Sequence, residues 1–191
     1  MSDIIDFRKY VLEKNKATSH SEQEAANEIL QLLNYDGKNI AIPIVKIAKN
    51  YGLKVYREDL RNAAGKLIVG KGSDNLYGGD KVIIVNFNDH IFEQRIVVAR
   101  ILGYYLMDAI NKKNHVNPNT PMTYTLDYER IYSKYEAFVL NILAPNEKFV
   151  EQYNIAVNNG LYGNKIALYL SKYFEVSGDF VQRKVKTLTR K

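Results

Sequence analysis

One stretch decides the fold of this 191-residue chain: Ile91-Phe-Glu-Gln-Arg-Ile-Val-Val-Ala-Arg-Ile-Leu-Gly-Tyr-Tyr-Leu-Met107. It is the most apolar segment of the sequence, and its apolar residues cover most of the circumference of a helix. A helix that is apolar nearly all round is buried on nearly all sides. The sequence therefore predicts one central helix around which the other elements pack.

The residues before this helix predict two short helices. Ser21-Glu-Gln-Glu24 has the form of a capping box, so we expect a helix from there to about Leu33. Pro43 opens the second helix, where its missing N–H costs nothing, and Gly52 supplies the left-handed residue that ends it.

Three β-like runs follow, separated by turn glycines. They are Leu53–Tyr56, Lys66–Val69 and Lys81–Val85. Short runs of β-branched and aromatic residues between glycines indicate strands joined by tight connections. We therefore expect a small sheet of hairpins.

The residues after the central helix predict a polar loop and then further helices. The loop is Asn111–Thr123, and the helices are Leu126–Leu143, Asn146–Val157, Asn164–Phe174 and Gly178–Leu188. Helices, a small sheet and then a run of helices make an α+β protein. We divide the chain into an N-terminal helical segment (1–40), a main domain (41–158) and a C-terminal helical pair (159–191).

Composition and charge exclude several classes of protein. With 46% hydrophobic and 25% charged residues the chain is globular rather than disordered, and the lack of cysteine excludes disulfides, thiolate zinc sites and cysteine nucleophiles. No apolar run reaches the roughly 18 residues of a membrane span, and the N-terminus lacks the apolar region of a signal peptide. We expect a cytoplasmic protein without a membrane partner. The net charge of +6 permits contact with nucleic acid.

Several segments resemble the ImmA/IrrE-type zinc metallopeptidases, in which a strand ending in Asn precedes a helix that carries an HELGH motif. The resemblance spans roughly residues 40–145 and implies a zincin-like fold with a small sheet and a central buried helix, followed by C-terminal helices. The segments that carry it are Ile42–Ala48, Ile83–Asn86, Gln94–Ala99, Leu102–Leu106 and Lys134–Pro145, the last ending in an LLMP-like turn.

The residues of the family's zinc site are replaced in this chain. In an HExxH motif two histidines one turn apart bind zinc, and the glutamate activates the zinc-bound water. When the sequences are aligned on Gly103, the histidine positions hold Arg100 and Tyr104, and the glutamate position holds Ile101. The family's third ligand falls on Lys134. We therefore expect no catalytic residues, no bound metal and no cofactor.

The replaced positions allow two interpretations. Arg100, Tyr104 and Asp108 are spaced to share one helix face, so with Lys134 they could form a polar binding pocket for a carboxylate, peptide or phosphate. Alternatively, Arg100 forms an internal ion pair with an acidic residue such as Glu136, and Tyr104 packs over it. A buried arginine requires such a partner.

The last two helices have the rhythm of a helix-turn-helix. Ser177 caps the second of them, and Val181, Val185 and Leu188 are expected to face inward. The same pattern resembles the closing helices of the ImmA/IrrE family, which pack on the core. The outward-facing residues that would contact nucleic acid are Gln182, Arg183, Lys186 and Arg190.

Active members of the family cleave helix-turn-helix repressors of mobile elements, prophages or stress regulons. The resemblance thus implies a pseudo-metallopeptidase of a phage or mobile element that regulates transcription by binding another protein, in the manner of an antirepressor. The partner implied is a helix-turn-helix repressor. Three alternatives stay open: a DNA-binding regulator, an enzyme with a repurposed cleft, and a metallopeptidase with non-standard ligands. The histidines, none of them paired at ligand spacing, are His20, His90 and His115.

Overall fold

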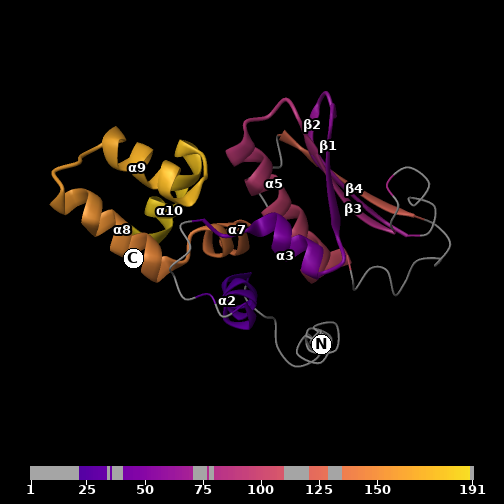
Figure 1. Ribbon diagram of the computed structural model, residues 1–191, viewed down its shortest axis with the longest axis horizontal. Helices are drawn as coiled ribbons and strands as arrows, with labels where there is room; N and C mark the ends of the chain where they lie inside the picture. Colours follow the sequence, from indigo (N-terminus) through magenta and orange to yellow (C-terminus); the bar gives the residue numbers. More distant parts are fainter. Residues whose placement is uncertain are drawn as a thin grey trace.

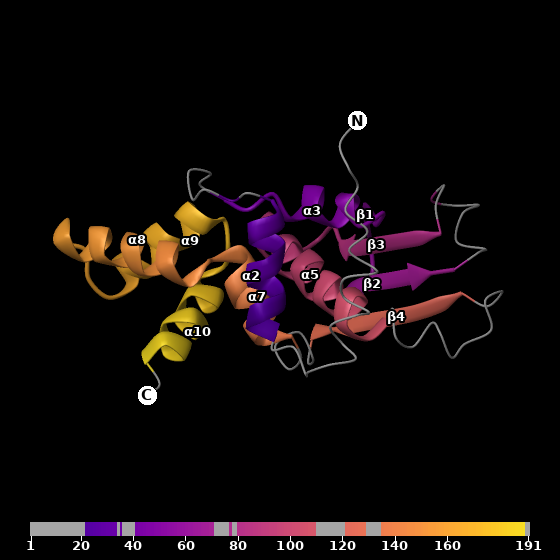
Figure 2. The same ribbon diagram turned by 90° about the horizontal axis from the view of Figure 1, so that it is seen from below.

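The computed structural model describes residues 22–33, 35, 41–70, 77, 80–109, 121–128 and 135–189. Within this part the chain has an α+β fold, as predicted: a small sheet lies at one end, helices run through the middle, and three C-terminal helices form the other end (Figures 1 and 2). No helix in the described ranges is long and apolar enough to cross a bilayer.

The sheet has four strands in the order β1-β3-β2-β4. Strand β2 runs antiparallel to both of its neighbours, whereas β1 pairs with β3 in parallel. The three predicted strands are confirmed, but the parallel pair means that the sheet does not consist of hairpins alone. The strands are β1 (Lys54–Glu58), β2 (Ala63–Val69), β3 (Lys81–Asn86) and β4 (Met122–Asp127).

Strand β4 corrects the sequence analysis. We expected the loop to run to Thr123 and a helix to begin at Leu126, but residues 122–127 form an edge strand and the next helix, α7 (Glu136–Leu143), begins ten residues later. Met122, Tyr124 and Leu126 alternate along one face of the strand, and Leu126 is fully buried. This period of two was the overlooked signal, because a helix does not place alternate residues on one side.

The predicted central helix is confirmed as α5 (Ile91–Tyr104), which continues as a π-helical turn, η1 (Tyr105–Ala109). Glycines let α5 approach its neighbours on two sides. A Cβ on Gly65 of β2 would lie 2.5 Å from Cγ1 of Val97, and a Cβ on Gly103 would lie 2.9 Å from a ring carbon of Phe138 in α7. Both distances are too short for non-bonded carbons, so only glycine allows this packing.

Two N-terminal helices complete the middle of the molecule. Helix α2 (Glu22–Leu32) packs on α7, and the Glu22 carboxylate accepts hydrogen bonds from the first backbone amides of α7. Helix α3 (Ile44–Asn50) packs against β1 and α5. The residue after its C-cap, Gly52, has a φ of 76°, as expected for a left-handed helix end. Ser21 of the predicted capping box lies outside the described residues.

The C-terminal helices form a separate group, in which α8 and α10 each pack against α9 (Figure 1). Helix α8 begins at Asn146, as predicted, with Pro145 as its N-cap. The expected cap on α10 is confirmed, since Oγ of Ser177 accepts a hydrogen bond from the amide of Phe180. The helices are α8 (Asn146–Asn158), α9 (Asn164–Phe174) and α10 (Gly178–Thr189).

Candidate functional site

The structure joins Arg100 to α7 through an ion pair. Arg100 is 1% exposed, and its guanidinium contacts the carboxylate of Glu136, the first residue of α7. The other oxygen of the same carboxylate lies 2.9 Å from Nε of Arg183 in α10. One carboxylate thus joins two arginines and connects three helices. This arrangement agrees with the internal ion pair that we considered for Arg100.

Tyr104 lies one turn further along α5, in a group of tyrosines. Its ring stacks on that of Tyr124 in β4, with centroids 3.8 Å apart, and meets the ring of Tyr135 edge to face at 6.1 Å. The hydroxyl of Tyr135 donates a hydrogen bond of 2.5 Å to Asp108. Burial and the Asp108 carboxylate together raise the pKa of Tyr135 well above its usual range, so Tyr135 stays protonated and can keep donating.

The expected grouping along α5 therefore holds in part. Tyr104 and Asp108 meet around Tyr135, while Arg100 is held by Glu136. These contacts occupy polar groups that an open binding pocket would leave available to a ligand. Lys134, the fourth member of the predicted pocket, lies outside the described residues.

Ile101 is the residue that the sequence analysis aligned with the catalytic glutamate of the ImmA/IrrE type. Its side chain is fully buried and faces β2, where Cδ1 would be 2.8 Å from a Cβ on Gly65. This position belongs to the contact between helix and sheet, and an isoleucine side chain has no group that binds or transfers a proton.

His90 has a structural role at the start of α5. Its Nδ1 accepts a hydrogen bond of 3.2 Å from the amide of Phe92, and its ring meets that of Phe92 edge to face. His20 and His115 lie outside the described residues. Within the residues that the structure does describe, no group of three or more His, Asp or Glu side chains is placed to hold a metal ion.

Strand β3 ends in a polar network around Asn86. The Asn86 amide is buried and donates to the carbonyl of Ala63 at 3.1 Å and to the hydroxyl of Tyr128 at 3.0 Å. Tyr128 in turn donates to the carboxylate of Asp89 at 2.9 Å. These bonds hold the end of β4 against the connection between β3 and α5, which explains physically why a strand ending in Asn precedes the central helix.

Helix α10 departs from the orientation that we expected. Gln182 and Lys186 are exposed as predicted, but Arg183 turns inward and is held by Glu136. Val181 is buried as predicted, whereas Leu188 is 38% exposed. Arg190 lies outside the described residues. Of the described candidates for nucleic-acid contact, two remain at the surface.

Sequence reasoning missed Lys184, the most unusual side chain of the C-terminal helices. It is 1% exposed, and its ammonium donates to the side-chain oxygens of Asn141 at 3.1 Å and Asn146 at 2.5 Å. Burial lowers the pKa of Lys184 to about 7. The signal was positional: Lys184 lies four residues after the buried Phe180 and three after Val181, on the inward stripe of α10.

No protein-family model matches the chain, and no curated protein matches it.

Proposed function

We propose that this chain is a catalytically inactive protein of the ImmA/IrrE type, with a zincin-like fold, which regulates by binding another protein. The observation that carries the proposal is the ion pair between Arg100 and Glu136, with Arg183 as its third member. It joins α5, which holds both histidine positions of an active relative, to α7, whose first residue is two positions after the third-ligand position, Lys134.

A zinc ion does not fit these residues. A guanidinium has no lone pair to donate and carries a positive charge, isoleucine offers no donor, and the ring of Tyr104 is stacked on Tyr124. An ion pair between α5 and α7 can hold the two helices together without a metal. A chain that keeps α5 and α7 but replaces the zinc ligands and the catalytic glutamate is suited to binding a protein rather than to hydrolysing it.

The partner that we propose is a helix-turn-helix repressor. Active members of the resembled family act on such repressors, and an inactive member that still recognises one would sequester it. Such a protein would act in the cytoplasm as an antirepressor of a phage or mobile element.

Two measurements test this function. Elemental analysis of the protein, purified without added zinc, should give far less than one metal ion per chain. Incubation with a panel of purified helix-turn-helix repressors, followed by biolayer interferometry and gel electrophoresis, should give binding to at least one repressor without cleavage. Stoichiometric zinc would show that other residues supply a metal site, and cleavage that a chelator blocks would show that the chain is a peptidase. If no repressor of the panel binds and none is cleaved, the chain does not act as an antirepressor.

A second candidate function is DNA binding through α10. It is favoured by the short connection between α9 and α10 and by the exposure of Gln182 and Lys186 on the second helix. DNA binding through α10 requires that the chain binds a duplex in a salt-dependent way and that Lys186→Ala weakens this binding. Lys172→Ala, on the exposed side of α9, is the matched control and should leave the binding unchanged. Arg183 is unsuited to this test, because its replacement also disturbs the pair with Glu136.

A further inference from the structure

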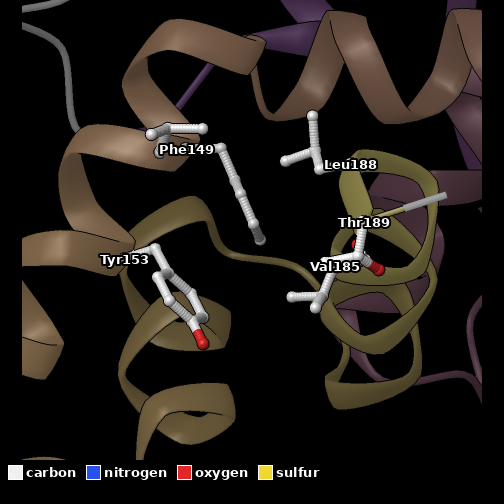
Figure 3. A pocket seen from close by; sticks show the side chains of 6 residues that line it. Phe149, Tyr153, Val185, Leu188 and Thr189 are labelled. Atoms are coloured by element: carbon white, nitrogen blue, oxygen red, sulfur yellow. Dashed lines mark hydrogen bonds between the residues drawn. The ribbon is translucent and has the colours of Figure 1, made fainter. Parts of the chain in front are cut away.

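A groove runs along the C-terminal helices, between α8 and α10 at one end and between α9 and α10 at the other. Two hollows form it, one of about 150 Å³ and one of about 370 Å³, and both are lined by Tyr153 of α8 and Val185 of α10. Figure 3 shows the smaller hollow, with Phe149 and Tyr153 on one side and Val185, Leu188 and Thr189 on the other. The two hollows adjoin, because Tyr153 and Val185 line both of them.

The smaller hollow is bordered by apolar side chains that water still reaches. Val150 on α8 is 45% exposed and Leu188 on α10 is 38% exposed. Both line the hollow, one on each wall. Exposed apolar side chains gathered beside a concave surface are typical of an interaction site, since a partner that covers them removes apolar area from water.

The charge of the groove is one-sided. Among the described residues that line the two hollows, Lys186 is the one charged side chain, and no carboxylate is present. The N-terminus of α9 also lies here, with Gly163 as its N-cap, and the amides of Lys165 and Ile166 donate to the carbonyls of Tyr162 and Gly163. A helix N-terminus carries partial positive charge. The groove thus favours a partner with negative charge beside apolar side chains.

We propose that this groove binds an amphipathic, acidic helix of a partner protein, with apolar side chains in the two hollows and a carboxylate near Lys186. The inference rests on the proposed function in one respect, namely that the chain acts by binding a protein. It assigns that binding to the C-terminal helices rather than to the face of α5 around Arg100 and Tyr104, where side chains already contact one another.

A helix suits the groove better than a β-strand or a nucleic acid. A peptide that binds as a β-strand needs a sheet edge to bond its backbone, whereas a helix satisfies its own backbone and inserts side chains at i, i+3 or i+4 and i+7. A duplex requires several cations to contact its phosphates. Among the described residues that line this groove Lys186 is the one cation, and Arg183 is ion-paired with Glu136.

The test selects ligands without assuming their sequence. A display library of helix-forming peptides is selected on the full-length chain, and the enriched peptides are labelled and measured by fluorescence anisotropy. We expect apolar residues at helical spacing and net negative charge in the enriched peptides. Leu188→Glu and Val150→Glu should each weaken their binding by about tenfold or more. Both residues are exposed, so the variants should fold, which circular dichroism checks.

Matched controls separate the groove from the rest of the surface. Leu168 on α9 is 57% exposed and lies outside both hollows, so Leu168→Glu should leave binding unchanged. Lys186→Glu should weaken the binding of the acidic peptides, whereas Lys172→Glu, on the exposed side of α9, should have little effect on it.

Several results would overturn the inference. In the selection, these are the absence of enrichment and the enrichment of basic or extended peptides. In the binding measurements, they are equal binding of the peptides to the Leu188→Glu variant and displacement of the peptides by duplex DNA. Self-association of the chain that Leu188→Glu abolishes would also contradict the inference. The proposed function fails differently. If a repressor binds the Leu188→Glu variant as tightly as the parent chain, the groove is not its binding site, but the proposed function still holds. If the chain cleaves a repressor in a zinc-dependent way, the proposed function is wrong, but peptide binding in the groove is not contradicted.

Discussion

The guanidinium of Arg100, in the middle of α5, forms an ion pair with the carboxylate of Glu136, the first residue of α7. The two residues are 36 positions apart in sequence. Close packing between Gly103 and Phe138 lets the two helices approach, and the carboxylate also reaches Arg183 of α10. The pair therefore connects the central helix with the C-terminal group.

Glu136→Gln should destabilise the protein by roughly 3 kcal/mol, because it removes the carboxylate from a buried guanidinium. Urea denaturation followed by circular dichroism measures the change. Glu147→Gln, in the exposed first turn of α8, is the control and should change the free energy of unfolding by less than about 0.5 kcal/mol. Equal stability of the two variants would mean that Arg100 does not depend on Glu136.

Lys184 should make the protein more stable as the pH rises from about 7 towards 10. Its pKa is about 7 in the folded protein and has the ordinary lysine value of 10.5 in the unfolded chain, so unfolding takes up a proton between these values. The free energy of unfolding should then rise by at most about 1.4 kcal/mol per pH unit in this window. Below pH 7 the ammonium is charged in both states and the dependence ends.

Lys184→Met isolates this effect from other groups that titrate in the same range. The side chains that contact the ammonium are Asn141, Asn146 and the ring of Phe149, and none of them is charged. Urea denaturation at several pH values between 7 and 10 should show the parent chain gaining stability relative to Lys184→Met. Parallel curves for the two proteins would place the ammonium in a more hydrated site than the structure does.

Gly65→Ala should destabilise the protein by roughly 2 kcal/mol, because the added methyl group would collide with Val97 and Ile101 of α5. Gly178→Ala is the matched control. The added Cβ at Gly178 meets nothing within 4 Å, and the position is helical, so a gain of up to about 1 kcal/mol is expected. Thermal denaturation of both variants distinguishes these outcomes. A stable Gly65→Ala protein would indicate looser packing between α5 and β2.

Glu175→Gly should stabilise the turn between α9 and α10. Glu175 has a φ of 51°, a left-handed conformation that costs a non-glycine residue about 1 kcal/mol. Its half-exposed carboxylate lies 3.4 Å from Arg95, an ion pair worth at most about 1 kcal/mol. The Glu175 carbonyl, which accepts a hydrogen bond from Arg95, is kept in either variant.

Glu175→Gln provides the comparison, since it removes the charge and keeps the strained backbone. A midpoint of thermal unfolding that is higher for Glu175→Gly than for Glu175→Gln is the expected result. If the glycine variant is the less stable of the two, the ion pair with Arg95 outweighs the backbone strain.

Local patterns in the sequence were enough to predict most elements of the fold. The continuous apolar surface of α5 predicted its burial, and Gly52 and Ser177 marked a helix end and a helix start. These features depend on side-chain periodicity and on hydrogen bonds between residues a few positions apart. Strand β4 obeys the same kind of rule, through Met122, Tyr124 and Leu126, and was missed because the sequence around it is polar.

Tertiary structure alone decided which of these elements meet and what their polar side chains contact. Sequence reasoning offered Arg100 either a ligand or an internal partner, and packing of α7 on α5 brought Glu136 to it. Packing also turned Arg183 inward and buried Lys184 beside two asparagines. Such contacts join residues dozens of positions apart, and their energies depend on burial. Periodicity along one chain segment does not say which other segment covers it.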